Sequence, residues 1–86
     1  MDAHAGNVTQ YIVGQGGTEY DCSVALTPLS GKWEDRFFLR RSDTSYHQYH
    51  DLILVALANN LSLRIWHGQT AGDSRKVIQH MSIYHD

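Results

Sequence analysis

Apolar residues in this sequence recur at every second position, then once at helical spacing, and then at every second position again. Five stretches alternate apolar and polar residues, which is typical of half-buried strands: residues 8–13, 18–26, 32–40, 61–66 and 77–84. Between the third and the fourth, residues 45–60 repeat their apolar side chains at helical spacing. The pattern therefore predicts a mainly β chain in the order strand, strand, strand, helix, strand, strand.

Element order and length together indicate the architecture. A chain of 86 residues is long enough for one domain, so we expect residues 1–86 to form a single core. Five strands with a helix after the third favour an OB-fold-like five-stranded barrel. The alternative is a helix on one face of an open antiparallel sheet. Residues 1–7 are small and polar, and we expect a loose N-terminal arm there.

The helical stretch carries more apolar side chains than one buried face needs. A capping box of Ser45 and Gln48 predicts its start, and Asn59-Asn60 predicts its end. The stripe expected to face the core consists of Tyr49, Leu52, Ile53, Ala56 and Leu57. Outside that stripe lie Leu54, Ala58 and Leu61. A helix that is apolar on most sides is usually covered on two sides, so we predict that these three residues form a subunit interface.

Charge and hydropathy argue against nucleic acid and membrane as partners. The net charge is −2, whereas phosphate binding needs clustered cations. Arg36, Arg40 and Arg41 do alternate with aromatic residues, a pattern that suits single-stranded nucleic acid. Acidic residues in the same stretch oppose that interpretation. The longest apolar run, residues 52–58, is far shorter than the roughly 20 residues of a membrane span.

No pattern in the sequence indicates catalysis. The single cysteine, Cys22, is in phase with apolar strand residues, so we expect a buried, inert thiol. His47, His50 and Asp51 could share a helix face, but histidines in a first turn are more often exposed or packed beside the cap. We therefore predict no enzyme activity, no metal and no cofactor.

Two segments resemble a known family. Residues 49–66 form a helix followed by an alternating strand, and residues 77–84 read Val-Ile-Gln-His-Met-Ser-Ile-Tyr. They resemble the matching segments of the pertussis- and subtilase-type B subunits of bacterial toxins. The resemblance implies an OB-fold, a pentameric ring with helices lining its centre, cell-surface glycans as ligands and a catalytic A subunit as partner.

Two functions remain open at this stage. The first is a non-catalytic, lectin-like module that binds glycans and assembles as a ring. Its expected sugar contacts are the polar positions around the second strand, Glu19, Tyr20, Asp21 and Ser23. The second is a small acidic protein, encoded by a phage or bacterium, that binds and inhibits or regulates another protein.

Two further expectations concern Trp66 and the start of the chain. Trp66 lies opposite the apolar face of its strand, beside Arg64 and His67, which predicts a position on the outer side of the barrel, at an interface or packed under a loop. Residues 1–6 lack the basic and apolar regions of a signal peptide. We expect a secreted protein if a leader has been removed, and a cytoplasmic one otherwise.

Overall fold

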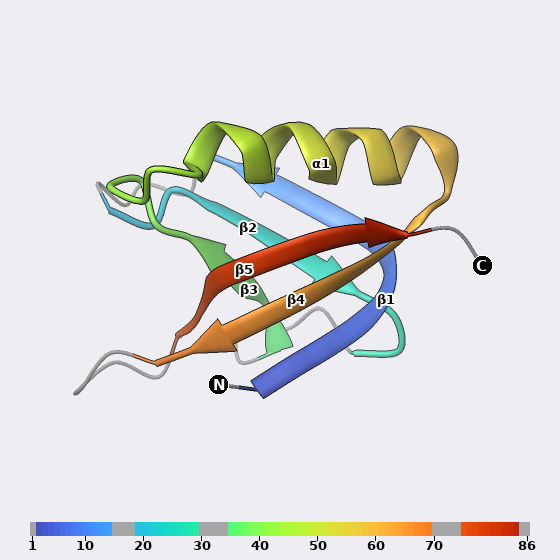
Figure 1. The fold of residues 1–86 in the computed structure, drawn as a ribbon, viewed down its shortest axis with the longest axis horizontal. Helices are drawn as coiled ribbons and strands as arrows, with labels where there is room; N and C mark the ends of the chain where they lie inside the picture. The colour runs from blue at the N-terminus through green and yellow to red at the C-terminus, as the bar shows by residue number, and fades with distance from the viewer. Residues whose placement is uncertain (1, 15–18, 30–34, 70–74, 85–86) are drawn as a thin grey trace.

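The computed structural model describes residues 2–14, 19–29, 35–69 and 75–84. Its elements follow the predicted order: β1 (Asp2–Val13), β2 (Cys22–Leu26), β3 (Phe37–Leu39), α1 (Tyr46–Asn59), β4 (Ser62–Gly68) and β5 (Lys76–Tyr84) (Figure 1). The prediction of a mainly β chain with one helix and a five-stranded sheet is confirmed. Within the described ranges, no helix is both long and apolar enough to cross a bilayer.

The strands form a closed barrel in the order β1-β2-β3-β5-β4. This spatial order differs from the order along the chain, because β5 lies between β3 and β4. The pairing of β3 with β5 is parallel, and the other four pairings are antiparallel. The ring closes because β1 pairs with β4 along its first half and with β2 along its second half.

The first half of β1 corrects the expectation of a loose N-terminal arm. Residues 2–7 pair in register with β4, from Asp2 opposite His67 to Asn7 opposite Ser62. The missing side chain of Gly6 is needed for this arrangement. A Cβ atom at Gly6 would collide with the carbonyl oxygen of Thr27, so β1 can pass this close to Thr27 only without a side chain.

The two central strands are shorter than the alternation predicts. The second predicted strand covered 18–26, whereas β2 begins at Cys22; residues 15–18 lie outside the described part of the chain. The third prediction covered 32–40, whereas β3 spans Phe37–Leu39, and 30–34 are likewise outside the description. The alternation of apolar and polar residues indicates which side chains are buried. The length of a strand also depends on where its partner strand ends.

The helix ends where the sequence predicts but begins differently. Asn60 adopts the left-handed conformation, with φ 54° and ψ 44°, and terminates α1. The expected capping box does not form, since Ser45 makes no side-chain cap. Instead, the Asp43 carboxylate accepts a hydrogen bond of 2.8 Å from the Ser45 amide.

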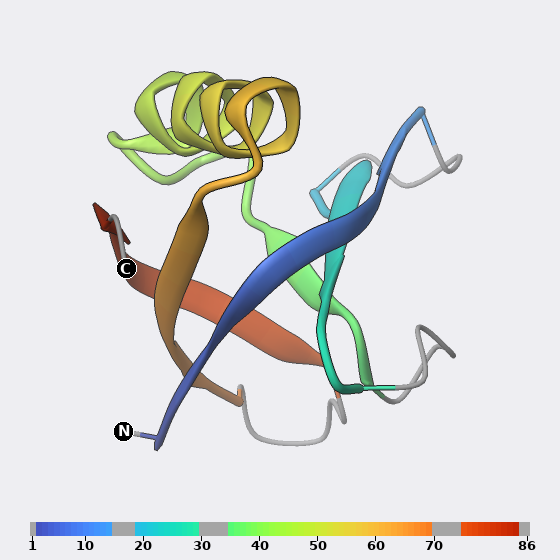
Figure 2. The same ribbon diagram turned by 90° about the vertical axis from the view of Figure 1, so that its right-hand side faces the viewer.

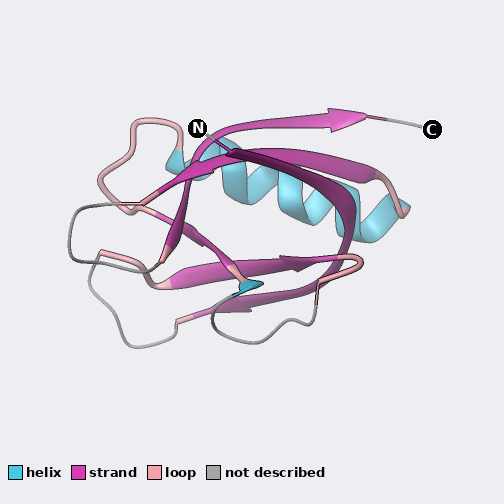
Figure 3. Cartoon of the chain, turned by 90° about the horizontal axis from the view of Figure 1, so that it is seen from below, coloured by secondary structure: helices cyan, strands magenta, loops and turns pink. Residues whose placement is uncertain are grey.

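One side of α1 covers an end of the barrel. The helix packs against β1, β4 and β5, as Figures 1 and 2 show from two directions, and from below it lies behind the strands (Figure 3). Its buried residues are Tyr49, Ile53 and Ala56. Leu57, which the sequence placed on the core-facing stripe, is 47% exposed. The buried stripe is therefore narrower than predicted, because the end of a narrow barrel accepts only one ridge of side chains.

The core fills the inside of the barrel beneath the helix. Its fully buried members come from every element except β1: Val24, Leu26, Phe37, Leu39, Ile53, Leu63, Ile65 and Ile78. From β1, Val8 and Tyr11 pack against this core while keeping some exposure. The outward faces of the strands are thus left to carry any binding surface.

Candidate binding surface

The outer face of β4 and β5 carries a cluster of aromatic and polar side chains. Leu63 and Ile65 point into the core, so the residues alternating with them, Arg64 and Trp66, lie on the outside. Residues directly opposite each other across a strand pair share a face. We define the Trp66 surface as Arg64 and Trp66 of β4 with their neighbours on β5, His80, Ser82 and Tyr84. The predicted outward position of Trp66 is confirmed.

Contacts within the Trp66 surface hold its rings in place. The Arg64 guanidinium lies 5.9 Å from the Trp66 ring centroid and 5.5 Å from that of Tyr84. The His80 imidazole meets the Trp66 indole edge-on at 5.0 Å, with 65° between the ring planes. Cation–π and edge-to-face contacts of this kind restrain side chains that would otherwise move freely in water.

The neighbouring strand places only small side chains beside the indole. In β1, Ala3 pairs with Trp66 and Ala5 pairs with Arg64, and opposite residues share a face. Trp66 is half-buried, while Arg64 and His80 are exposed. The surface therefore combines a partly exposed indole with Arg64 over its ring and with polar neighbours that donate and accept hydrogen bonds.

Two of the four predicted sugar contacts are internal. Asp21 is 6% exposed and Ser23 is completely buried. The Ser23 hydroxyl accepts a 2.7 Å hydrogen bond from Nε of Arg36, and its carbonyl accepts one of 3.0 Å from Nη2. Both side chains are buried and bonded within the domain, so the expectation that they contact a ligand is corrected.

The other two predicted contacts, Glu19 and Tyr20, are half-buried beside arginines. Arg40 places Nε 3.7 Å from the Glu19 carboxylate and donates a hydrogen bond of 3.1 Å to the Tyr20 hydroxyl. The Arg75 guanidinium lies 5.1 Å from the Tyr20 ring centroid. The structure thus does not bring the four predicted residues together as one open site.

Asp21 belongs to a polar network under the start of α1. Its carboxylate accepts a 2.9 Å hydrogen bond from the Tyr46 hydroxyl and forms an ion pair with Arg41. Burial by itself would raise the pKa of Asp21, but the bonds from Tyr46 and Arg41 outweigh it, and that pKa is lowered. The Cys22 thiol lies 3.2 Å from the Tyr46 hydroxyl and is buried, as predicted. The network attaches the helix to β2.

The outward face of β2 and β3 is closed to ligands. Ser23 and Ala25 of β2 and Phe38 of β3 point away from the barrel interior, yet all three are buried. Arg36 is 3% exposed and also donates a 2.9 Å bond to the Gln10 side chain. One of the three arginines whose pattern suits single-stranded nucleic acid is therefore bonded inside the domain.

The predicted interface residues separate into two groups. Leu54 is 44% exposed and Ala58 is exposed, both on the outer side of α1. Leu61 is half-buried and packs against the core, so it differs from Leu54 and Ala58 in exposure. Val55, at 46% exposure, joins Leu54 and Ala58 on the outer side. We call Leu54, Val55 and Ala58 the outer helix stripe.

The helix histidines do different things. His50 shares a 2.8 Å hydrogen bond between its Nδ1 and the Tyr11 hydroxyl, whereas His47 is exposed and lies edge-on to Tyr46. Across the described residues, no group of three or more histidine, cysteine, aspartate or glutamate side chains is placed to hold a metal ion.

Comparisons with protein-family models, with curated proteins and with solved structures found no match. The Trp66 surface is therefore interpreted from its own chemistry.

Sequence reasoning singled out Trp66 and Arg64 but not the β5 side chains beside them. His80 and Tyr84 lie in a different strand, and only the register of β4 with β5 brings them to Trp66 and Arg64. The sequence signal that could have indicated them was the apolar/polar alternation of both strands, which places these residues on the outer face. Because a shift of one residue would turn all of these side chains to the other face, the phase alone could not identify the pairs.

Proposed function

We propose that this chain is a non-catalytic glycan-binding domain whose sugar platform is the Trp66 surface. The carrying observation is a half-exposed indole held by Arg64 and His80 on a sheet face where its other neighbour is an alanine. The carbon-bound hydrogens of a sugar ring pack against an indole face. Arg64, His80 and Ser82 then supply hydrogen bonds for the hydroxyl groups around the ring.

The architecture supports this proposal. We propose an OB-fold-like barrel, because β1 pairs with both β2 and β4 and the helix α1 lies between β3 and β4. OB-folds bind oligonucleotides and oligosaccharides, commonly on the face of their second and third strands. Here the outward side chains of that face are buried, so we assign binding to the face of β4 and β5 instead.

Charge favours a sugar over a nucleic acid on this surface. Among the five residues of the Trp66 surface, Arg64 is the only permanent cation, and the whole chain carries −2. Binding to a phosphate backbone depends on several Lys or Arg contacts. A neutral glycan requires only ring stacking and hydrogen bonds, which this surface offers.

The test is a glycan array followed by calorimetric titration of the strongest glycan. Trp66→Ala should weaken that glycan at least tenfold, which corresponds to about 1.4 kcal/mol. Trp66→Phe should retain part of the affinity because it keeps an aromatic face. Val13→Ala, which shortens an apolar side chain that is 60% exposed on β1, serves as the control and should change nothing. An array without signal for any glycan would reject the proposal.

We further propose that copies of this chain associate through the outer helix stripe. Leu54 and Val55 expose large apolar side chains there, and the small Ala58 allows a second backbone to approach closely. Asp51 is the only acidic residue in α1, and the helix has no Lys or Arg, so two copies meet without strong repulsion. The toxin-subunit resemblance favours a ring of five.

Light scattering after size-exclusion chromatography tests the assembly. Leu54→Asp should lower the measured mass to that of one chain while circular dichroism remains β-rich, because a charge in a desolvated contact is strongly unfavourable. Leu54→Ala shortens the side chain without adding a charge, so it serves as the control and should disturb the assembly less than Leu54→Asp. A wild-type monomer would contradict self-association.

The exposed apolar helix also favours a second candidate function. The same outer helix stripe could receive a different protein, as expected of a small inhibitor or regulator. A wild-type monomer that recovers one stoichiometric protein in a pull-down, with recovery lost in Leu54→Asp, would support this candidate over the ring.

A further inference from the structure

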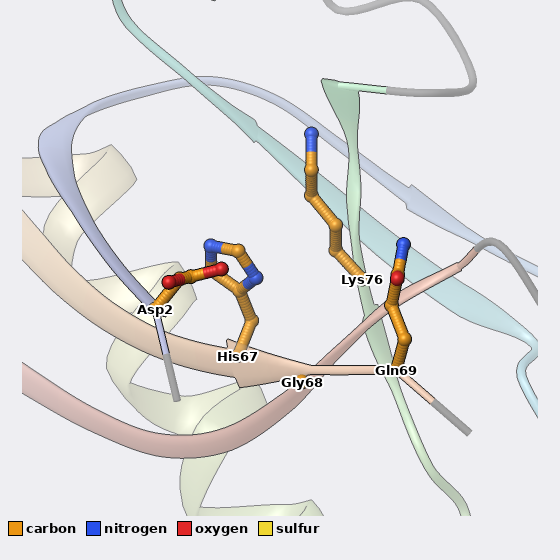
Figure 4. A pocket seen from close by; sticks show the side chains of 5 residues that line it. All are labelled: Asp2, His67, Gly68, Gln69 and Lys76. Carbon is orange, nitrogen blue, oxygen red and sulfur yellow. The ribbon is translucent and has the colours of Figure 1, made fainter. Parts of the chain in front are cut away.

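A small polar pocket opens at one end of the barrel. It has a volume of about 210 Å³ and is lined by Asp2, His67, Gly68, Gln69 and Lys76 (Figure 4). The lining comes from β1, from β4 with the residue that follows it, and from the start of β5. The first two strands are paired here, with Asp2 opposite His67.

The inner side of the pocket is built on aromatic rings. His67 packs against Phe37 with 5.1 Å between their ring centroids, and Phe37 is 1% exposed. On its other side, Phe37 is stacked by His4 at 5.9 Å, and His4 is held by a 3.0 Å contact between its Nε2 and the Thr27 carbonyl. These contacts fix His67 in position, so the pocket is preformed.

The polar groups around the opening carry charges of both signs and offer both donors and acceptors. Asp2 brings an exposed carboxylate, and Lys76 brings an ammonium group that lies 3.7 Å from Asp35. Gln69 brings an amide with both kinds of group. Burial lowers the pKa of His67, so its imidazole is neutral at pH 7. A strongly anionic ligand would meet Asp2, and a cationic one would meet Lys76.

The size and chemistry of the pocket define what it can hold. Drug-sized ligands occupy roughly 300–1,000 Å³, so 210 Å³ suits a single small ring. The mixture of acceptors and donors suits a neutral molecule with several hydroxyl groups. Carboxylates accept from two adjacent hydroxyls, while ammonium and amide groups donate to others.

The pocket and the Trp66 surface lie on opposite faces of the same two strands. His67 follows Trp66 directly in β4, and Asp2 precedes Ala3, the residue that pairs with Trp66. Successive strand residues point to opposite faces, and His67 packs against the buried Phe37. We propose that the pocket is a second sugar site, which holds one neutral sugar ring separately from the platform at Trp66. This inference rests on the proposed glycan-binding function and adds a second site of sugar recognition at the barrel end.

The first experiment titrates free monosaccharides against the full chain labelled with ¹⁵N. The probes are D-glucose, D-galactose, D-mannose and N-acetyl-D-glucosamine, with D-glucuronate and D-glucosamine as charged analogues. At least one neutral sugar should shift the amide signals of His67, Gly68 and Gln69 with millimolar affinity, and more strongly than either charged analogue. No shift at these amides, or tighter binding of a charged analogue, would overturn the second sugar site.

Variants then separate the second sugar site from the platform. Asp2→Asn keeps the shape of the side chain but removes its charge and should weaken the monosaccharide at least fivefold. Asp51→Asn makes the same charge change at an exposed position on α1 and should have no effect. Trp66→Ala should leave the monosaccharide affinity within twofold while weakening the glycan selected on the array.

The outcomes distinguish the two proposals. If Trp66→Ala weakens the glycan but Asp2→Asn behaves like Asp51→Asn, the second sugar site is wrong and the platform stands. If the glycan binds equally to wild type and Trp66→Ala, the proposed function is wrong, whatever the pocket binds.

Discussion

Removing the charge of Asp21 should destabilise the domain in a pH-dependent manner. Asp21 is 6% exposed and connects β2 to the start of α1 through the Tyr46 hydroxyl, while Arg41 pairs with it from the solvent side. Asp21→Asn keeps the side-chain shape and one oxygen that can still accept from Tyr46. It replaces the other oxygen with an NH₂ group whose donors face the donors of Arg41.

The magnitude follows from the type of hydrogen bond that is lost. A hydrogen bond to a charged group contributes about 1.5–3 kcal/mol, and one to a neutral group about 0.5–1.5 kcal/mol. The Arg41 side chain is largely in water, so its ion pair adds little. With the unmatched donor included, Asp21→Asn should lower the free energy of unfolding by about 2 kcal/mol. In a domain of this size that lowers Tm by roughly 8–16 °C.

The pH dependence gives the sharper test. The folded-state pKa of Asp21 is lowered, so its contribution to stability is present above the unfolded-state pKa of about 3.9 and is lost as pH falls through the folded value. Urea unfolding followed by tryptophan fluorescence should therefore show a wide gap between wild type and Asp21→Asn at pH 7 and a narrow one near pH 2. The control Asp51→Asn removes an exposed carboxylate and should unfold like wild type at both pH values. An equal gap at both pH values would refute the reasoning, because the charge would then contribute nothing.

Three further changes test the core, the close approach of β1 to Thr27 at Gly6, and the partly buried His67. Ile53→Ala opens a cavity under α1 and should cost about 2–5 kcal/mol in urea unfolding, whereas Leu57→Ala on the exposed side should cost far less. Gly6→Val should prevent soluble folding or lower Tm sharply, since even a Cβ would collide with the Thr27 carbonyl; an unchanged Tm would show that β1 can move there. Burial lowers the pKa of His67, so its contribution to stability is present above the unfolded-state pKa of about 6.5 and is lost as pH falls below it. His67→Gln should reduce the loss of stability between pH 7.5 and pH 5, and an unaltered loss would contradict this.

The elements could be predicted because each has its own local signal. The apolar spacing of α1 and the left-handed preference of Asn60 depend only on neighbouring residues, and both appear in the structure as expected. The same holds for the buried phase of Cys22 and for the outward phase of Trp66. In each case the physical cause, side-chain periodicity or a backbone preference, acts within a few residues.

The binding surface could not be predicted in the same way. Glu19 and Asp21 have the polarity of surface residues. Arg40 and Arg41, which directly follow β3 in the chain, nevertheless form ion pairs with them within the domain. Sequence periodicity reports polarity, but it does not report which distant residue will neutralise a charge. On β4 the opposite holds: the residue of β1 that pairs with Trp66 is an alanine, and Trp66 stays partly exposed.

The sequence by itself determined the order of the elements, the end of the helix and the inward or outward phase of most strand residues. Tertiary structure decided that residues 2–7 form part of the barrel, because pairing with β4 satisfies backbone groups that a loose arm would leave to water. It also decided that Leu61 packs against the core while Leu54 stays exposed, although the two leucines are alike in hydrophobicity. Burial depends on what a closed barrel brings near each side chain, and strand order and register, which set those neighbours, arise from contacts between residues far apart in the chain.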